Sequence, residues 1–104
     1  PTRRSSDLKY INKNYKNLDF VVFGGDNFNN NVKGNADALA YKKIVDKLHC
    51  ATFHVRGNKE SNPKPNDAIH LDEFKSLFMS NKALKVSGND WMLETKGYIF
   101  LGLD

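Results

Sequence analysis

Two short apolar runs, each ending in glycine, dominate the hydrophobic pattern of the first half of the chain. Residues 20–23, FVVF, are continuously β-branched or aromatic and stop at Gly24 and Gly25. Residues 51–56, ATFHVR, form a second run that stops at Gly57. A run of this kind is typical of a strand covered on both faces, as in a parallel sheet. The pattern therefore predicts two buried strands.

Helical periodicity surrounds these runs. The apolar spacing of residues 8–16 predicts the end of an amphipathic helix, and a longer helix, capped near Asn35, is expected to run up to about His49. The apolar positions of the longer helix are Ala36, Leu39, Ala40, Ile44, Val45 and Leu48. A strand, a helix and a strand make one right-handed βαβ unit, so the two strands should be parallel neighbours.

The second half of the chain predicts a helix and a hairpin. Residues 61–68, SNPKPNDA, contain two prolines and should be an irregular connection. Leu71, Phe74, Leu77 and Phe78 then lie on one face of a helix. The final segment, WMLETKGYIFLGLD, reads as two strands around TKG. The fold class predicted from these elements is α/β.

Polar residues follow both buried strands at their carboxyl ends. GGDN closes the first strand and GNKE closes the second, so Asp26 and Asn58 should lie side by side. A carboxylate can hold two cations at once, and the neutral amide oxygen of Asn58 can complete a coordination shell. The neighbouring glycines remove Cβ atoms and let a ligand come close. A two-metal centre here could activate a hydroxide and hold a phosphate oxygen for in-line attack.

The combination of DFVVFGGDN, FHVRGNKE and ETKGYIFLGLD resembles the calcineurin-like metallophosphoesterase family. The family pattern reads DxH, GD, GNH followed by Asp or Glu, a lone His, and GHxH. The resemblance runs from about residue 8 to residue 104, and only the GD and GN blocks are present. It implies a partial αββα sandwich, with two β-sheets between helices. It also implies a hydrolase that cleaves phosphate esters with two divalent ions of Mn, Fe or Zn.

The resemblance assigns a role to each residue of the two motif blocks. Asp26 matches the ligand that bridges the metals, and Asn58 matches a ligand of the second metal. Lys59 stands where the family has a histidine thought to stabilise the transition state or protonate the leaving group. Glu60 stands where an acidic partner orients that histidine. Asp19, at the start of the first strand, is expected to be structural.

Lys59 departs from the family pattern. An ammonium group can neutralise charge on a phosphoryl oxygen, but it is a poor proton donor near neutral pH unless desolvation lowers its pKa. We therefore expect electrostatic stabilisation by Lys59 with little acid catalysis.

The missing motifs limit what these 104 residues can do alone. The resemblance places DxH before residue 1 and the later histidines after residue 104, so residues 9–104 would be the N-terminal and central part of a domain truncated at both ends. Residues 1–8, PTRRSSDL, resemble the translation of a sequencing adapter and are expected to be a non-native or disordered tail. The fragment is expected neither to bind two metals tightly nor to turn over substrate.

Composition indicates the cellular compartment and the kinds of partner to expect. The 39% hydrophobic share suffices for one small core, and no apolar run approaches a membrane helix, so no membrane partner is expected. The single cysteine, Cys50, indicates a reducing, cytoplasmic compartment and should be a small buried hydrophobe. The net charge of +4 comes mostly from dispersed lysines, which makes a nucleic-acid partner unlikely and suits an anionic phosphate-ester substrate.

Other polar residues have structural explanations. His49 and His70 should be surface residues, and His54 should be packed or hydrogen-bonded within its strand. Arg56 is expected to form an ion pair, and Asn27 is a weak candidate for lining the site.

Two other functions stay open. The chain could be a noncatalytic α/β module that cradles a phosphate or nucleotide with backbone amides, or a degenerate scaffold member of the same family. Against the cradle, GGDN places an acid where only N–H groups are wanted, and neither GxGxxG nor GxxxxGK[ST] occurs. Lys59 alone favours the scaffold.

Overall fold

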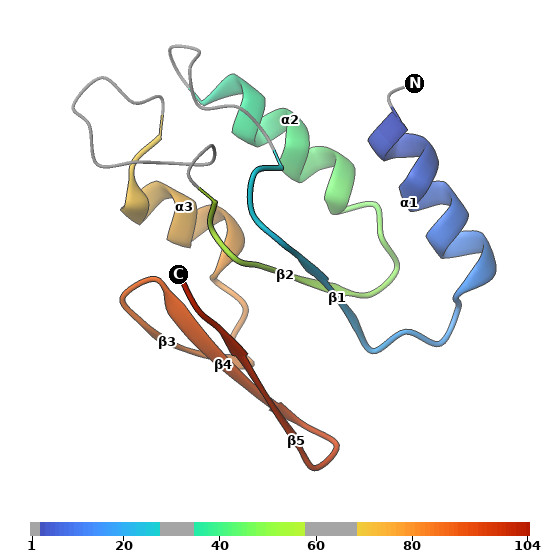
Figure 1. Ribbon diagram of the computed structural model, residues 1–104. Coiled ribbons are helices and arrows are strands. Elements are labelled where there is room, and N and C mark those ends of the chain that lie inside the picture. The colour runs from blue at the N-terminus through green and yellow to red at the C-terminus, as the bar shows by residue number, and fades with distance from the viewer. Residues whose placement is uncertain (1–2, 28–34, 58–68) are drawn as a thin grey trace.

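The computed structural model describes residues 3–27, 35–57 and 69–104. Helices and strands alternate in its first half, and the second half ends in three consecutive strands (Figure 1). The elements are α1 (Arg3–Asn14), β1 (Phe20–Phe23), α2 (Ala36–Val45), β2 (Ala51–His54), α3 (Leu71–Phe78), β3 (Leu84–Ser87), β4 (Asp90–Thr95) and β5 (Tyr98–Gly102). This confirms the predicted α/β fold class.

Strands β1 and β2 form a parallel two-stranded sheet, with Phe20 opposite Ala51 and Phe23 opposite His54. Helix α2 lies between them in sequence, as predicted for a βαβ unit. This helix ends at Val45, short of the predicted end near His49.

Strands β3, β4 and β5 form a separate antiparallel sheet in that order. The predicted C-terminal hairpin is β4 and β5, joined at Lys96 and Gly97, whose φ angles are 51° and 81°. Positive φ at both loop residues is typical of a type I′ turn, which matches the twist of paired strands. Strand β3 was not predicted, because LKVS has only two apolar positions and three of its four residues are exposed.

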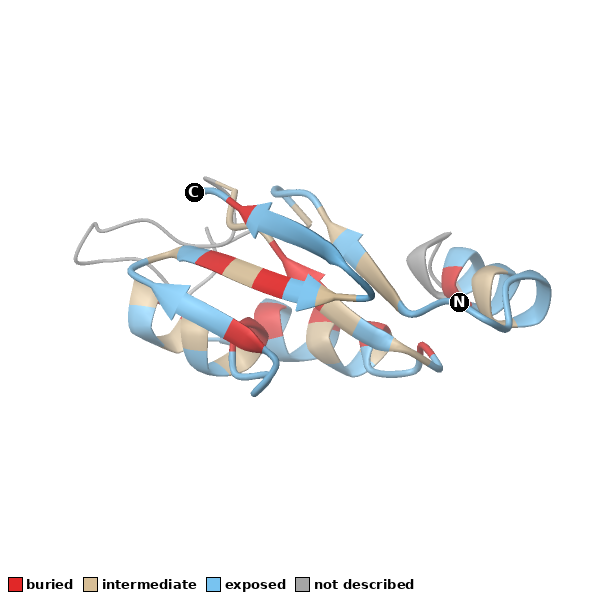
Figure 2. Cartoon of the chain, turned by 90° about the horizontal axis from the view of Figure 1, so that it is seen from below, coloured by how far each residue is buried: buried red, intermediate tan, exposed pale blue. Residues whose placement is uncertain are grey.

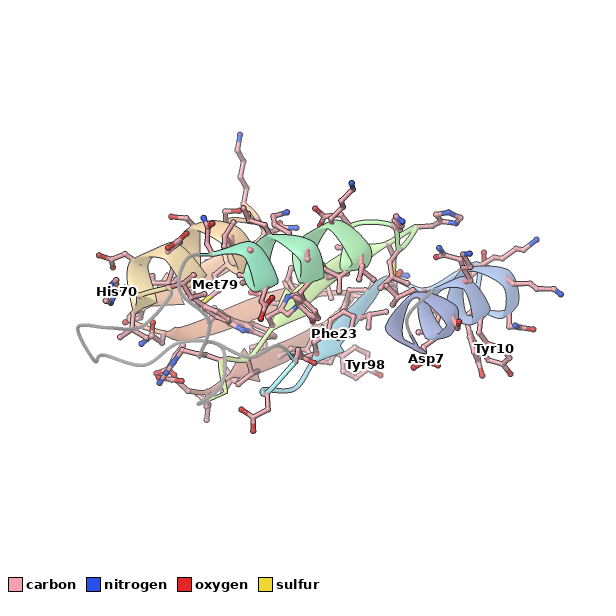
Figure 3. All side chains as sticks on the ribbon, turned by 90° about the horizontal axis from the view of Figure 1, so that it is seen from above. Asp7, Tyr10, Phe23, His70, Met79 and Tyr98 are labelled. Carbon is pink, nitrogen blue, oxygen red and sulfur yellow. The ribbon has the colours of Figure 1, made fainter. Side chains whose placement is uncertain are left out.

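Helices α2 and α3 cover one face of the parallel sheet. Phe23 and His54 stand on that face with their rings stacked 4.9 Å apart, at an angle of 11° between the planes. The ring of Tyr41 from α2 meets both of them edge-on, and Phe78 from α3 packs on His54. Figure 3 shows α2 and α3 on this side of the strands.

The antiparallel sheet covers the other face. Phe20 and Phe53 alternate with the helix-facing residues of their strands, and their rings contact Phe100 of β5 and Trp91 of β4 respectively. The described layers are therefore helices, parallel sheet and antiparallel sheet, which corresponds to part of an αββα sandwich. The buried apolar side chains between them are Leu8, Ala38, Tyr41, Val45, Leu48, Phe53, Ile69, Phe74, Phe78, Met79, Leu84, Trp91 and Leu93.

Two details differ from the sequence prediction. The helix whose end was expected at residues 8–16 spans Arg3–Asn14, so residues 3–8, expected to belong to a non-native or disordered tail, are helical, and Leu8 is buried. Asn35 does precede α2 as its cap residue, but its side-chain amide donates to Glu73 Oε2 at 3.0 Å instead of capping the helix. Glu73 lies on α3, so this contact joins the two helices.

Candidate functional site

The carboxyl ends of β1 and β2 continue side by side beyond the strands. The amide of Val55 donates to the carbonyl oxygen of Phe23 at 3.1 Å, one residue past the last paired position of β2. Because the strands are parallel, the loops that follow them start at the same edge of the sheet. The GGD and RG segments therefore end side by side, whereas Asn58, which was predicted to lie beside Asp26, is outside the described residues.

Gly25 and Gly57 meet at van der Waals distance where these loops begin. A Cβ atom on Gly25 would lie 2.5 Å from Gly57 Cα and 2.7 Å from Gly57 N. A Cβ atom on Gly57 would overlap both the backbone nitrogen and the carboxylate Oδ1 of Asp26. Glycine is required at both positions because backbone occupies the space of any side chain.

Asp26 sits on this contact in a left-handed conformation, with φ of 64°. Aspartate is among the few residue types that adopt this conformation at modest energetic cost. Its carboxylate oxygen Oδ1 lies against Gly57, and the residue is exposed to solvent. Asn27 donates from its side-chain amide to the carbonyl of Gly24 and so closes the loop around Asp26.

A third strand end is tied to the same edge. Arg56 binds Asp104 through two parallel hydrogen bonds, Nε to Oδ1 at 3.0 Å and Nη2 to Oδ2 at 2.9 Å. The Asp104 amide also donates to Asp90 Oδ1 at 2.7 Å. The ion pair expected for Arg56 is confirmed. Its partner was missed in the sequence, although Asp104 ends an apolar strand just as Asp26 does.

We call the segment ends at Asp26, Gly57 and Asp104 the strand-end rim. The three come from β1, β2 and β5, and so from both sheets. The Arg56 guanidinium is held by the Asp104 carboxylate through an ion pair. Arg56 therefore has a structural role at the rim, where it connects the end of β2 to the end of β5.

Asp19 lies at the opposite end of β1. Its Oδ1 accepts a hydrogen bond from Lys96 Nζ at 2.7 Å, and both side chains are more than half exposed, at 51% and 69%. The structural role expected for Asp19 agrees with this position, far along the strand from Asp26.

The histidines take the predicted positions. His54 is 3% exposed, and its Nε2 lies 2.9 Å from the Tyr41 hydroxyl, while its carbonyl accepts a hydrogen bond from Trp91 Nε1 at 2.9 Å. His49 and His70 are exposed. Thus His54 links the helix layer to the antiparallel sheet and belongs to the core.

Cys50, expected to be a small buried hydrophobe, is half-buried. It lies in a hollow beside the C-terminal ends of α2 and α3, and burial raises the pKa of its thiol. A raised pKa keeps the thiol protonated and unreactive at neutral pH.

Asn58, Lys59 and Glu60, the other predicted site residues, lie outside the described residues. Within residues 3–27, 35–57 and 69–104, no three His, Cys, Asp or Glu side chains gather closely enough to hold a metal ion. Of the two predicted metal ligands, Asp26 lies within the described residues. Asp26 touches Gly57, and Asn58 is the next residue after Gly57 in the sequence.

Comparisons with protein-family models, with curated proteins and with solved structures found no match. No helix in the described part of the chain is both long and apolar enough to cross a membrane.

Proposed function

We propose that this chain is part of a metal-dependent phosphoesterase domain that hydrolyses phosphate esters at a dinuclear metal centre. The observation that supports this most strongly is the contact between the Asp26 carboxylate and Gly57. It brings an acidic residue against the residue that precedes Asn58, at an edge where parallel sheets commonly bind ligands. The calcineurin-like motif order requires that neighbourhood.

The carboxylate of Asp26 is a ligand type that suits a divalent cation. Asp26 is exposed, and its neighbours Gly25 and Gly57 have no side chains. An ion and a substrate can therefore approach the Asp26 carboxylate closely. In the proposal Asp26 bridges two ions of Mn, Fe or Zn, and Asn58 completes the shell of one of them. Such a pair of ions supplies a nucleophile at neutral pH and neutralises charge on the phosphate.

The positive charge that faces the substrate would come from the ions and from Lys59. Arg56 binds Asp104 through Nε and Nη2, so its charge is already compensated by that carboxylate. Lys59 would stabilise a phosphoryl oxygen electrostatically, with Glu60 as the group that orients it.

The proposed activity belongs to a longer protein. The resemblance implies several histidine ligands from the DxH, lone His and GHxH motifs, and these motifs do not occur in the 104 residues. Alone, the chain should bind metal weakly and be inactive. Tight paired binding of Mn²⁺ to this chain in a calorimetric titration would contradict that expectation.

A phosphate cradle made of backbone amides is less compatible with the rim. Such a cradle presents N–H groups to the anion. Here a carboxylate oxygen lies against Gly57, where it would repel a phosphate unless a cation stood between them.

The test is hydrolysis of p-nitrophenyl phosphate and bis-p-nitrophenyl phosphate by the longer protein in the presence of Mn²⁺. Asp26→Asn should lower kcat/KM by about 100-fold or more, because an amide cannot bridge two ions as a carboxylate does. Asp37→Asn, at an exposed position in the first turn of α2, is the matched control and should leave the rate unchanged. Full activity in Asp26→Asn would refute the proposal.

A further inference from the structure

A groove beside helix α1 gathers positive charge. It is formed by α1, by the residues just after this helix, and by the segment between α2 and β2, and its volume is about 620 Å³. Its lining residues are Lys9, Asn12, Lys13, Tyr15, Lys16 and His49. None of the six is acidic, so the charge of this surface, which we call the α1 groove, has one sign. In Figure 2, α1 stands beside the label N and is coloured as exposed along most of its length.

Asn12 holds the two walls of the α1 groove together. Its side-chain amide donates to the carbonyl oxygen of Lys47 at 2.9 Å, and its Oδ1 accepts a hydrogen bond from the backbone amide of His49 at 3.0 Å. Leu8, one turn earlier on α1, is buried in the core. The groove is therefore built by the packed fold and does not depend on the sequence of α1 alone.

The three lysines form a row along one wall. Lys9 and Lys13 are one turn apart on α1, Lys16 follows just after its end, and all three are exposed. At a rise of about 1.5 Å per residue, the row spans roughly 10 Å. The ion pairs among the described residues are formed by other cations, namely Lys42, Arg56 and Lys96. Within that part of the chain, the groove lysines have no carboxylate partner.

The unpaired charges determine what can occupy the groove. An apolar segment, whether from the longer domain or from another protein, would bury the ammonium groups without compensation and carry a large desolvation penalty. An occupant must therefore bring negative charge. A single phosphate would neutralise only part of a row about 10 Å long, so the occupant should carry several negative groups in succession.

Tyr15 adds an aromatic surface to this row. The residue is 54% exposed and lines the groove together with the lysines. A basic groove with an accessible aromatic ring is the combination by which proteins bind single-stranded nucleic acid, because bases stack on the ring while the cations follow the backbone. An acidic protein segment would supply carboxylates for the lysines but no base for the ring.

We propose that the α1 groove binds single-stranded nucleic acid, with successive phosphates on Lys9, Lys13 and Lys16 and a base stacked on Tyr15. The sequence disperses its lysines, which argues against such a partner, but the fold aligns these three in one groove. The groove lies at the amino ends of β1 and β2, whereas the strand-end rim lies at their carboxyl ends. Binding there does not depend on the proposed metal centre.

The test is the fluorescence anisotropy of a short fluorescein-labelled oligothymidylate titrated with the 104-residue chain. We expect a Kd of about 10–100 μM at about 0.1 M NaCl, the range typical of binding through phosphate contacts. The affinity should fall as salt is added. The slope of log Kd against log[NaCl] should be about 2, because each of three phosphate contacts on a single strand contributes about 0.7.

Replacement of all three groove lysines by glutamine should weaken binding by about tenfold or more and remove most of the salt dependence. The control variant carries the same change at three lysines outside the groove, Lys75, Lys82 and Lys85. It has the same net charge and should change Kd by less than about threefold. Equal losses in the two triple variants would mean that net charge alone attracts the strand, and would overturn the proposal.

Tyr15→Leu should weaken binding by about fivefold or more and leave the salt slope unchanged, because it removes stacking but no charge. Unlabelled oligoglutamate of the same length should displace the labelled strand far less well than unlabelled oligothymidylate does. Circular dichroism should show the same fold in all variants. Displacement by both competitors at equal concentrations, or unchanged binding in Tyr15→Leu, would assign the groove to an acidic protein segment and overturn the proposal. No binding at any concentration would also overturn it.

Discussion

Gly25 and Gly57 lie against each other with no room for a side chain on either, although 32 residues separate them in sequence. This contact joins the ends of two parallel strands and holds Asp26 at the rim. It is the structural basis of the proposed metal site, and it can be perturbed by a single methyl group.

Gly57→Ala should destabilise the fold. The added Cβ would overlap the backbone nitrogen and Oδ1 of Asp26, so the two loops would have to separate, at a cost of about 1–3 kcal/mol. Gly24→Ala is the control, because a Cβ at Gly24 meets no atom within 4 Å. In urea denaturation, Gly57→Ala should lower the free energy of unfolding by that amount, and Gly24→Ala should change it by less than about 0.5 kcal/mol. Equal stabilities would contradict the contact.

Tyr41→Phe should destabilise the core. The Tyr41 hydroxyl lies 2.9 Å from His54 Nε2, both side chains are buried, and removal of the hydroxyl leaves the imidazole nitrogen without that partner. A loss of about 1–3 kcal/mol is expected. Tyr10→Phe, at a tyrosine that is 61% exposed, should be neutral in the same thermal melts. If the two variants have the same melting temperature, the buried hydrogen bond makes no measurable contribution to the stability of the fold.

Arg56→Ala should destabilise more than Lys96→Ala. Arg56 and Asp104 are 19% and 23% exposed and form two hydrogen bonds, whereas Lys96 and Asp19 are largely exposed and form one. Solvent screening reduces the second pair to about 0–1 kcal/mol, while the loss of Arg56 leaves Asp104 without its partner and costs more. Comparison of the two unfolding midpoints checks the order. The reverse order would mean that β5 is not braced at the rim.

Lys59 can be tested, in the longer protein that the proposed function requires, with substrates whose leaving groups differ in pKa. Because an ammonium group donates a proton poorly near neutral pH, Lys59→His should raise the rate most for substrates with poor leaving groups. Lys59→Ala should slow all substrates by a similar factor, since it removes charge stabilisation. Identical rates for the three proteins would exclude a catalytic role for Lys59.

The sequence predicts those parts of the fold that depend on local pattern. The FVVF and ATFH runs identify β1 and β2, and the glycines after them mark where each strand ends. The position of Asp26 beyond β1 follows from the same pattern. Strand β3 was missed because four mostly exposed residues, LKVS, carry too weak an alternation to stand out.

Contacts between residues far apart in the sequence cannot be predicted from the local hydrophobic pattern. The sequence shows that Gly57 follows a strand, but the overlap with Asp26 depends on the register of β1 against β2. Likewise, an ion pair could be expected for Arg56, but its partner is fixed by the stacking of two sheets and the position of the last strand. Such contacts are properties of the packed layers and require the structure.

The proposed divalent cation would bind at the strand-end rim through Asp26. The most direct measurement is a titration of the ¹⁵N-labelled chain with Mn²⁺, followed by paramagnetic broadening of the backbone amide signals. We expect the Asp26 and Gly57 signals to broaden first, Mg²⁺ or EDTA to reverse the broadening, and Asp26→Asn to abolish it. Broadening that starts elsewhere, for example at the exposed Asp46, or that persists in Asp26→Asn, would contradict cation binding through Asp26.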